Sequence, residues 1–137
     1  MKTHTTNYTN TFIEVAEDCP VQSAEIPPIK GDNKTIANLQ YEMVFNNPYK
    51  YTSDDVLFHC YTMRNSIPAS EMEKSRQTFF SKGQACMRAS ALPKRYGFGV
   101  HHNEESKMAI LPLESEEYKK LASDPKLKHL KAMKSKK

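Results

Sequence analysis

The stretch from Tyr96 to Leu113, YGFGVHHNEESKMAILPL, constrains the fold more than any other part of the chain. Tyr96–His102 alternates large side chains with small or polar ones, which is typical of a strand. Asn103–Ser106 suits a four-residue tip built around a type I turn, and Lys107–Leu113 returns as a second strand. The stretch therefore predicts an antiparallel β-hairpin.

The two faces of the first hairpin strand carry different side chains, because successive residues of a strand point to opposite sides. One face holds Tyr96, Phe98, Val100 and His102, and the other holds Gly97, Gly99, His101 and Asn103. Two adjacent histidines therefore cannot hold one metal ion from one face, and HHNEE lacks the helical-turn spacing of HExxH. A metal ion would need partners from elsewhere, such as His59 or Asp54, so no metal site is predicted.

Gly97 and Gly99 leave the backbone bare on one face of this strand. A glycine inside a strand often marks a close approach by another group. That group is either a helix packed against the strand or a bound ligand. Helix packing is the commoner arrangement, since ligand pockets are few in any one protein.

Periodicity, caps and chain breakers predict the other elements. Thr11–Ala16 is rich in β-branched and aromatic residues, which favours a strand. A helix over Lys34–Asn46 begins after Asn33 as its N-cap. Ser70 opens a second helix through an S-x-x-E capping box, and this helix ends before Gly83. The remaining segments are a strand at Ala85–Ala89, a turn at Leu92–Pro93 and a helix over Glu116–Ser123 capped by Ser115.

The segment Val56–Met63, VLFHCYTM, is open to two interpretations. Its β-branched and aromatic content favours a strand. Thr52 and Asp55, however, have the spacing of a capping box, which favours a helix. With the strand, the elements follow the order β-α-β-α-β-β-β-α. This order predicts a single α+β domain with a mostly antiparallel sheet and about three helices.

Charge divides the chain into a body, residues 1–125, and a Lys-rich tail, residues 126–137. The net charge is +4, but the last twelve residues hold six of the twenty basic residues and no acid. Fourteen basic and sixteen acidic residues remain in the body. The tail is either frayed or a helix with Leu127, Leu130 and Met133 on one side. We expect any nucleic-acid binding to be weak, non-specific and confined to this tail.

The cysteine content indicates a reducing compartment. The three cysteines, Cys19, Cys60 and Cys86, are odd in number and have no CxxC spacing. Reduced thiols of this kind are typical of a cytoplasmic protein. The N-terminus lacks the apolar core of a secretory signal, and no apolar run approaches the roughly 20 residues that span a bilayer. The sequence therefore predicts a soluble cytoplasmic protein without membrane contact.

An acid-free span points to a binding site for a small anionic ligand. No Asp or Glu occurs between Glu73 and Glu104, whereas basic residues recur throughout. Guanidinium and ammonium groups beside an aromatic ring and bare backbone can hold a phosphate or a carboxylate. The predicted ligand-binding residues are Arg88, Lys94, Arg95, Tyr96 and His101. Alternatively, these cations form a solvated face that balances acids elsewhere on the surface.

A second hypothesis is a hydrolase or transferase that uses Cys86 as a nucleophile or a histidine pair, and Arg88 or a histidine could lower the pKa of the Cys86 thiol. The alternative is a buried structural cysteine, because free Cys is among the most buried residue types. Ser90 lacks the G-x-S-x-G elbow, and the chain has no P-loop and no full G-x-G-x-x-G motif. No cofactor is therefore predicted.

Several strings together resemble a family of small bacterial proteins without an assigned function. They are NTFIEVA, LQYEM, NPYKYTSDDVLF, FFSKGQAC and LPKRYGFGVHH. The resemblance extends from the first predicted strand to the last predicted helix. It implies a soluble, cytoplasmic single-domain protein, and it supplies no site residues.

The hairpin GFGVHHNEESKMAIL and the helix after it are also similar to domains of the TfoX and YjbR type. This likeness implies a nucleic-acid-associated module as a further alternative function. A likeness in fold alone is a weak basis for assigning function.

Overall fold

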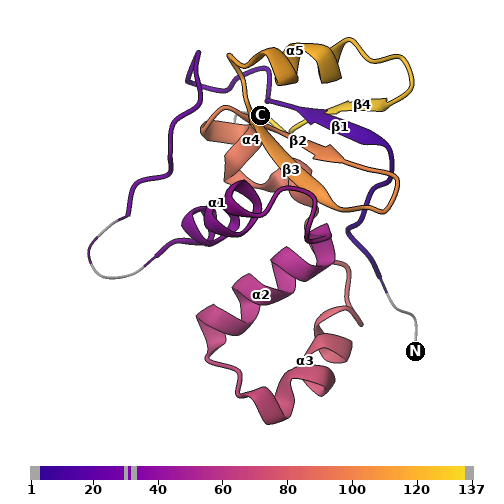
Figure 1. Ribbon diagram of the computed structural model, residues 1–137. Helices are drawn as coiled ribbons and strands as arrows, with labels where there is room; N and C mark the ends of the chain where they lie inside the picture. Colours follow the sequence, from indigo (N-terminus) through magenta and orange to yellow (C-terminus); the bar gives the residue numbers. More distant parts are fainter. Residues whose placement is uncertain (1–3, 30, 32–33, 135–137) are drawn as a thin grey trace.

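The computed structural model describes residues 4–29, 31 and 34–134. These residues contain a four-stranded sheet with the order β3-β2-β1-β4 (Figure 1). The strands are β1, Thr11–Glu14; β2, Phe98–His102; β3, Met108–Pro112; and β4, Lys128–Lys131. β2 pairs antiparallel with both β1 and β3, whereas β4 pairs parallel with β1. The predictions of an α+β domain and of the hairpin are confirmed.

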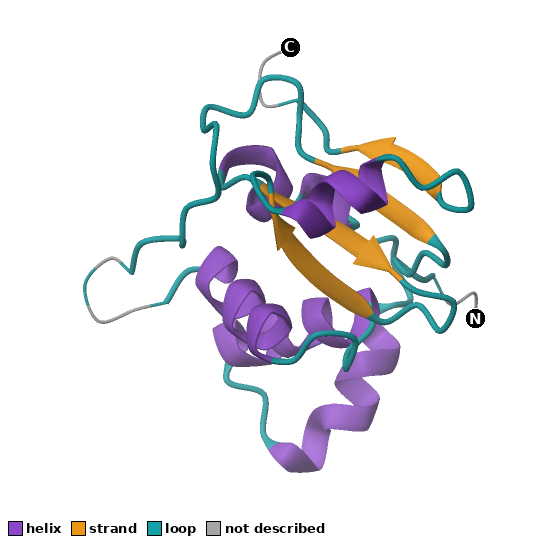
Figure 2. Cartoon of the chain, turned by 45° about the horizontal axis from the view of Figure 1, so that its top comes forward, coloured by secondary structure: helices purple, strands orange, loops and turns teal. Residues whose placement is uncertain are grey.

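The described residues form five α-helices, more than the three expected. They are α1, Ile36–Asn46; α2, Ser53–Asn65; α3, Met72–Phe79; α4, Ala91–Arg95; and α5, Glu116–Ala122. Two short 3-10 turns, η1 (Ala69–Glu71) and η2 (Met87–Ala89), precede α3 and α4. α5 covers one face of the sheet, whereas α1, α2 and α4 pack on the other face (Figures 1 and 2).

Apolar side chains between the sheet and the α1, α2 and α4 layer form the main core. Ile13 and Val100 project from the sheet and are fully buried. Val56 of α2 and Leu92 of α4 reach the same cluster and are also fully buried. Complete burial of one such side chain contributes about 1.5–3 kcal/mol relative to exposure. The helices are therefore held to the sheet chiefly by apolar contacts.

The strand predicted at Val56–Met63 is wrong, because this segment lies inside α2. The capping box that favoured a helix is present: Asp55 donates its backbone N–H to the Thr52 hydroxyl at 3.1 Å. Thr52 in turn donates its own N–H to the Asp55 carboxylate at 3.1 Å. Val56 and Cys60, one helical turn apart, point into the core. Burial at helical spacing thus outweighs the β propensity of the segment.

The strand predicted at Ala85–Ala89 and the turn at Leu92–Pro93 are also wrong. Residues 87–89 form η2, and α4 begins directly after Ser90. The Ser90 hydroxyl caps this helix by accepting from the Leu92 N–H at 3.2 Å. Pro93 fits the first turn, where an N–H would have no partner within the helix.

The other predicted helices are found with small shifts of their ends. α1 begins after Thr35, whose side chain accepts from the backbone N–H of Asn38; the predicted cap at Asn33 lies outside the described residues. η1 precedes α3 where one continuous helix from Ser70 was expected. Ser115 caps α5 by accepting from the Tyr118 N–H at 3.2 Å.

The described part of the Lys-rich tail is a strand, so the expectation of a frayed or helical segment is wrong there. Lys128 donates its N–H to the Asn10 carbonyl at 2.8 Å, and Ala132 donates to the Glu14 carbonyl at 2.9 Å. Arg88 fixes the outer side of the strand: its Nε donates to the Lys131 carbonyl at 2.8 Å, and its own carbonyl accepts from Met133. β4 therefore completes the sheet.

We expect deletion of residues 126–137 to lower the free energy of unfolding by at least about 3 kcal/mol, since several backbone hydrogen bonds are lost at about 1 kcal/mol each. Urea unfolding monitored by circular dichroism would measure this loss. The matched control replaces Lys126 and Lys128 by Gln, which removes charge and keeps the strand. A truncated protein as stable as the full chain would show that β4 adds nothing to the fold.

Two aromatic rings occupy the space over Gly99. A Cβ atom at this position would lie 2.6 Å from Cε2 of Tyr118, in α5, and 2.7 Å from Cζ of Phe12, in β1. The two rings meet edge to face with centroids 5.0 Å apart. Packing of a helix, rather than a ligand, therefore explains the bare backbone here. Gly97 has a different reason, a φ of +78° with Val21 close by.

Gly99→Ala should destabilise the protein by about 1–3 kcal/mol, because the methyl group overpacks the contact between the rings. Gly83→Ala is the matched control, since the nearest atom to an added Cβ there is His4 Nδ1 at 4.0 Å. Thermal unfolding of both variants would compare them. Equal melting temperatures would contradict the close contact with Phe12 and Tyr118.

Candidate functional site

The five residues predicted to bind an anion are divided between two parts of the fold. Lys94 and Arg95 lie in the last turn of α4, and Tyr96 follows as its C-cap. Arg88, in η2, uses its Nε in the contact with β4. None of these four residues has an ion pair with a carboxylate among the described residues. The structure thus keeps Lys94, Arg95 and Tyr96 together at one end of α4.

His101 lies on the opposite face of the sheet from α4. It is paired in register with Phe12, whose ring packs against α5. Its Nδ1 is 2.8 Å from the Tyr49 hydroxyl, and burial lowers the pKa of the ring. An anion site that includes all five residues is therefore not assembled around one point. An anion site at the end of α4 stays a prediction, as does weak nucleic-acid binding through the tail.

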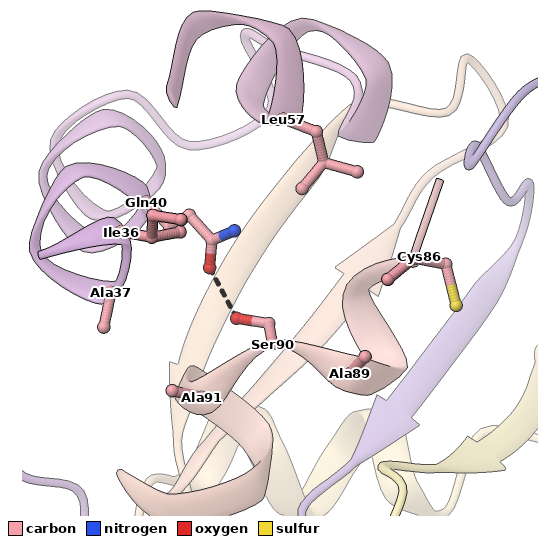
Figure 3. Close-up of a pocket in the computed structure, with 9 residues that line it drawn as sticks. Ile36, Ala37, Gln40, Leu57, Cys86, Ala89, Ser90 and Ala91 are labelled. Carbon is pink, nitrogen blue, oxygen red and sulfur yellow. Dashed lines mark hydrogen bonds between the residues drawn. The ribbon is translucent and has the colours of Figure 1, made fainter. Parts of the chain in front are cut away.

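A groove runs between α1, α2 and the segment of residues 84–91. It consists of two adjoining cavities of about 240 Å³ and 290 Å³, which share Ile36, Leu57 and Ala85 as walls. Figure 3 shows the first cavity, with α1 on one side and η2 and α4 below. The second cavity continues along α2, past Tyr61 to Arg64, with Phe79 of α3 beside it. Most of this lining is apolar.

Gln40 is a polar residue of α1 whose side chain reaches this groove. Gln40 is only 3% exposed, and its Oε1 accepts from the Ser90 hydroxyl at 2.5 Å. The oxygen of the same hydroxyl accepts from the Leu92 N–H, so Ser90 donates to Gln40 and caps α4 at once. Figure 3 shows the Gln40 side-chain nitrogen pointing into the cavity, toward the side of Leu57. Among the described residues this nitrogen has no hydrogen-bond partner.

Cys86 lies on the wall of the same cavity and contacts a tyrosine behind it. The Cys86 Sγ is 3.1 Å from the Tyr8 hydroxyl. Burial raises the pKa of Tyr8 to about 12, and the contact with Cys86 adds to this shift. Tyr8 therefore stays a neutral phenol near neutral pH and cannot serve as a base for the thiol.

His102 contacts the tyrosine of this cluster. Its ring meets the Tyr8 ring edge to face, with centroids 5.2 Å apart. It is fully buried, and burial lowers its pKa to about 4. Neither ring nitrogen has a hydrogen-bond partner in the part of the chain that the structure describes. His102 is thus a neutral core histidine separated from the thiol by Tyr8.

A larger hollow of about 550 Å³ lies between β3, the end of α1 and α5. Phe45, Tyr49 and Leu121 line it, together with the exposed side chains of Glu117 and Lys120. Ser115, its other polar lining residue, is engaged as the cap of α5. It therefore lacks a buried polar group directed into it, which distinguishes it from the groove at Gln40.

Sequence reasoning missed Gln40, Leu57 and the role of Ser90. One signal was available: Gln40 follows Leu39 on a helix whose neighbouring turns are apolar, and a polar residue on a buried face needs a partner. The partner, Ser90, is fifty residues away along the chain. The pairing of α1 with α4 could therefore not be inferred from spacing.

Within the described ranges, no group of three or more His, Cys, Asp or Glu side chains is arranged to hold a metal ion. The same residues include no helix with the length and apolar character needed to cross a membrane.

The structure defines a small α+β domain with an apolar groove between its helices. Comparison of the sequence with protein families gives the more specific assignment: the model of DUF6157, a family of unknown function, matches residues 3–137. The chain belongs to this family, as its sequence strings predicted. No curated protein and no solved structure matches the chain.

The thiols should differ in accessibility. Cys86 is half-buried on the groove wall, whereas Cys60 is 2% exposed and burial raises its pKa to about 11. We expect iodoacetamide to modify Cys86 in the native protein and Cys60 only after unfolding, because the thiolate is the reactive form. Peptide mapping by mass spectrometry would separate the sites. Equal labelling of both cysteines in the native protein would contradict this arrangement.

Proposed function

We propose that the protein binds a small, largely apolar molecule in the groove between α1 and α2. The observation that carries the proposal is Gln40, a buried residue whose side-chain nitrogen points into an apolar cavity and has no hydrogen-bond partner among the described residues. Ligand sites are typically concave and apolar, with a few polar groups placed to orient the ligand. The two cavities and Gln40 have this character.

The free amide N–H at the cavity wall can contribute to ligand binding. The Gln40 nitrogen is not among the fully buried unpartnered atoms, so water can reach it in the cavity. A ligand atom that accepts from it therefore contributes the net value of one hydrogen bond, about 0.5–1.5 kcal/mol. The apolar walls supply the remainder, at about 25 cal/mol for each Å² of apolar surface removed from water. The groove thus offers both affinity and orientation.

The contacts around Cys86 favour binding over thiol catalysis. A nucleophilic cysteine needs a base or a cation that promotes its thiolate. Its closest described polar partner is instead the Tyr8 phenol, and His102 lies behind that ring. His59 is exposed on α2 and does not line either cavity.

Lys94 and Arg95 support a second candidate, a surface site for a small anion at the end of α4. Neither has a carboxylate partner within the described part of the chain. A thermal-shift screen with nucleotides, phosphosugars and carboxylic acids tests this site, because the double substitution Lys94→Ala and Arg95→Ala would abolish anion binding at α4 and leave the groove intact.

A thermal-shift screen with small apolar compounds would test the groove. A ligand at 100 times its Kd should stabilise the protein by about 2.7 kcal/mol. Ala85→Trp should abolish the shift, since Ala85 is exposed and lines both cavities. Leu121→Trp, in the hollow beside α5, is the matched control and should leave the shift unchanged. Loss of binding in the Leu121 variant alone would place the site elsewhere.

A further inference from the structure

We infer that the ligand of the groove is a carbonyl compound, with its oxygen bound by the Gln40 amide N–H and its hydrocarbon part lying along α2. This inference rests on the proposed function and specifies the chemistry of its ligand. It follows from which hydrogen-bonding positions of the groove are already occupied and which are free.

The first argument concerns the direction of the free hydrogen bond. A chain of donors runs from the Leu92 N–H to the Ser90 oxygen at 3.2 Å, and from the Ser90 hydroxyl to Gln40 Oε1 at 2.5 Å. This chain uses the acceptor of the Gln40 amide and leaves its two N–H donors for the cavity. A ligand must therefore present an acceptor at this point, as a carbonyl or carboxylate oxygen does.

The second argument concerns charge. Among the described residues that line the two cavities, Arg64 is the only charged one, and no carboxylate faces either cavity. A ligand with an ammonium group would lose water without gaining a counter-ion, which is costly in an apolar site. Neutral and anionic carbonyl compounds both present an acceptor to Gln40, whereas Arg64, at the far end of the groove, lies beside the hydrocarbon part of the ligand.

The third argument concerns the space beside the amide. Leu57, Tyr61 and Arg64 follow one side of α2 at steps of four and three residues. Seven residues of helix correspond to about 10 Å, so the groove accommodates an extended chain of several carbons. Phe79 packs against Tyr61, with their ring centroids 4.8 Å apart, and lines the same cavity. The hydrocarbon part of the ligand would thus lie against aromatic and aliphatic side chains.

Matched compounds with one chain length test the inference: methyl octanoate, octanoate and octylamine. We expect the wild-type protein to bind both carbonyl compounds at least tenfold more tightly than octylamine in isothermal titration at neutral pH. Gln40→Met should weaken the binding of methyl octanoate about tenfold and leave the binding of octylamine unchanged. Gln40→Glu, which replaces the donor by an acceptor, should reverse the order in favour of octylamine. Arg64→Gln should leave binding of methyl octanoate unchanged, because the ester group lies at the Gln40 end of the groove.

The possible outcomes separate the inference about the carbonyl group from the proposal of the groove. If wild-type protein binds octylamine as tightly as methyl octanoate, the carbonyl inference is wrong, even where Ala85→Trp still abolishes binding and so supports the groove. This comparison needs no substitution at Gln40, so it decides the matter even if variants there fail to fold. If none of the three compounds binds, or if Ala85→Trp changes nothing, the groove itself is not the site and both proposals fall.

Discussion

β1 is the element on which both layers of the protein depend, because it pairs with β2 on one side and with β4 on the other. Its two central side chains point in opposite directions and are fully buried. Ile13 enters the core beneath α1, α2 and α4, whereas Phe12 packs with Tyr118 of α5 over the bare backbone at Gly99. A four-residue strand thus couples two separate packing surfaces, and the space left by one glycine sets how closely α5 approaches the sheet.

The elements that could be predicted are those whose signals are local. The hairpin, α1 and α5 are each specified by periodicity, turn residues or caps within one short segment of the chain, and the structure contains all three. α2 was predicted as a strand because a short apolar run does not reveal by itself whether it is a strand or a helix. α4 was predicted as a turn because of Pro93, although a proline is also accommodated in the first turn of a helix. Burial of Val56 and Leu92 against the sheet decided the outcome. β4 was not predicted as a strand because its lysines are typical of a solvated tail. The strand that it pairs with, β1, also lies more than one hundred residues earlier in the sequence.

The candidate site was less accessible to prediction than the fold. Charged residues attract notice in a sequence, so Lys94, Arg95 and His101 were obvious candidates, but position on the sheet separates His101 from the other two. The groove is formed by three segments distant in sequence, and its polar residue is an uncharged amide. Gln40 becomes informative only once Ser90 is seen to occupy its oxygen. Such a site depends on tertiary contacts that no local pattern encodes.

The Ser90–Gln40 hydrogen bond also explains why the fold tolerates a polar group so close to the core. It satisfies the Gln40 oxygen, caps α4 and joins that helix to α1 in one short network. Replacing both partners of a buried hydrogen bond by apolar groups is often nearly neutral, so the link between α1 and α4 does not by itself require a polar pair, although Ser90 is also needed as the cap of α4. What the polar pair adds is an oriented donor at the cavity wall. Orientation of that kind contributes little to stability and much to discrimination between ligands, because an analogue that lacks the matching acceptor leaves the donor unpaired.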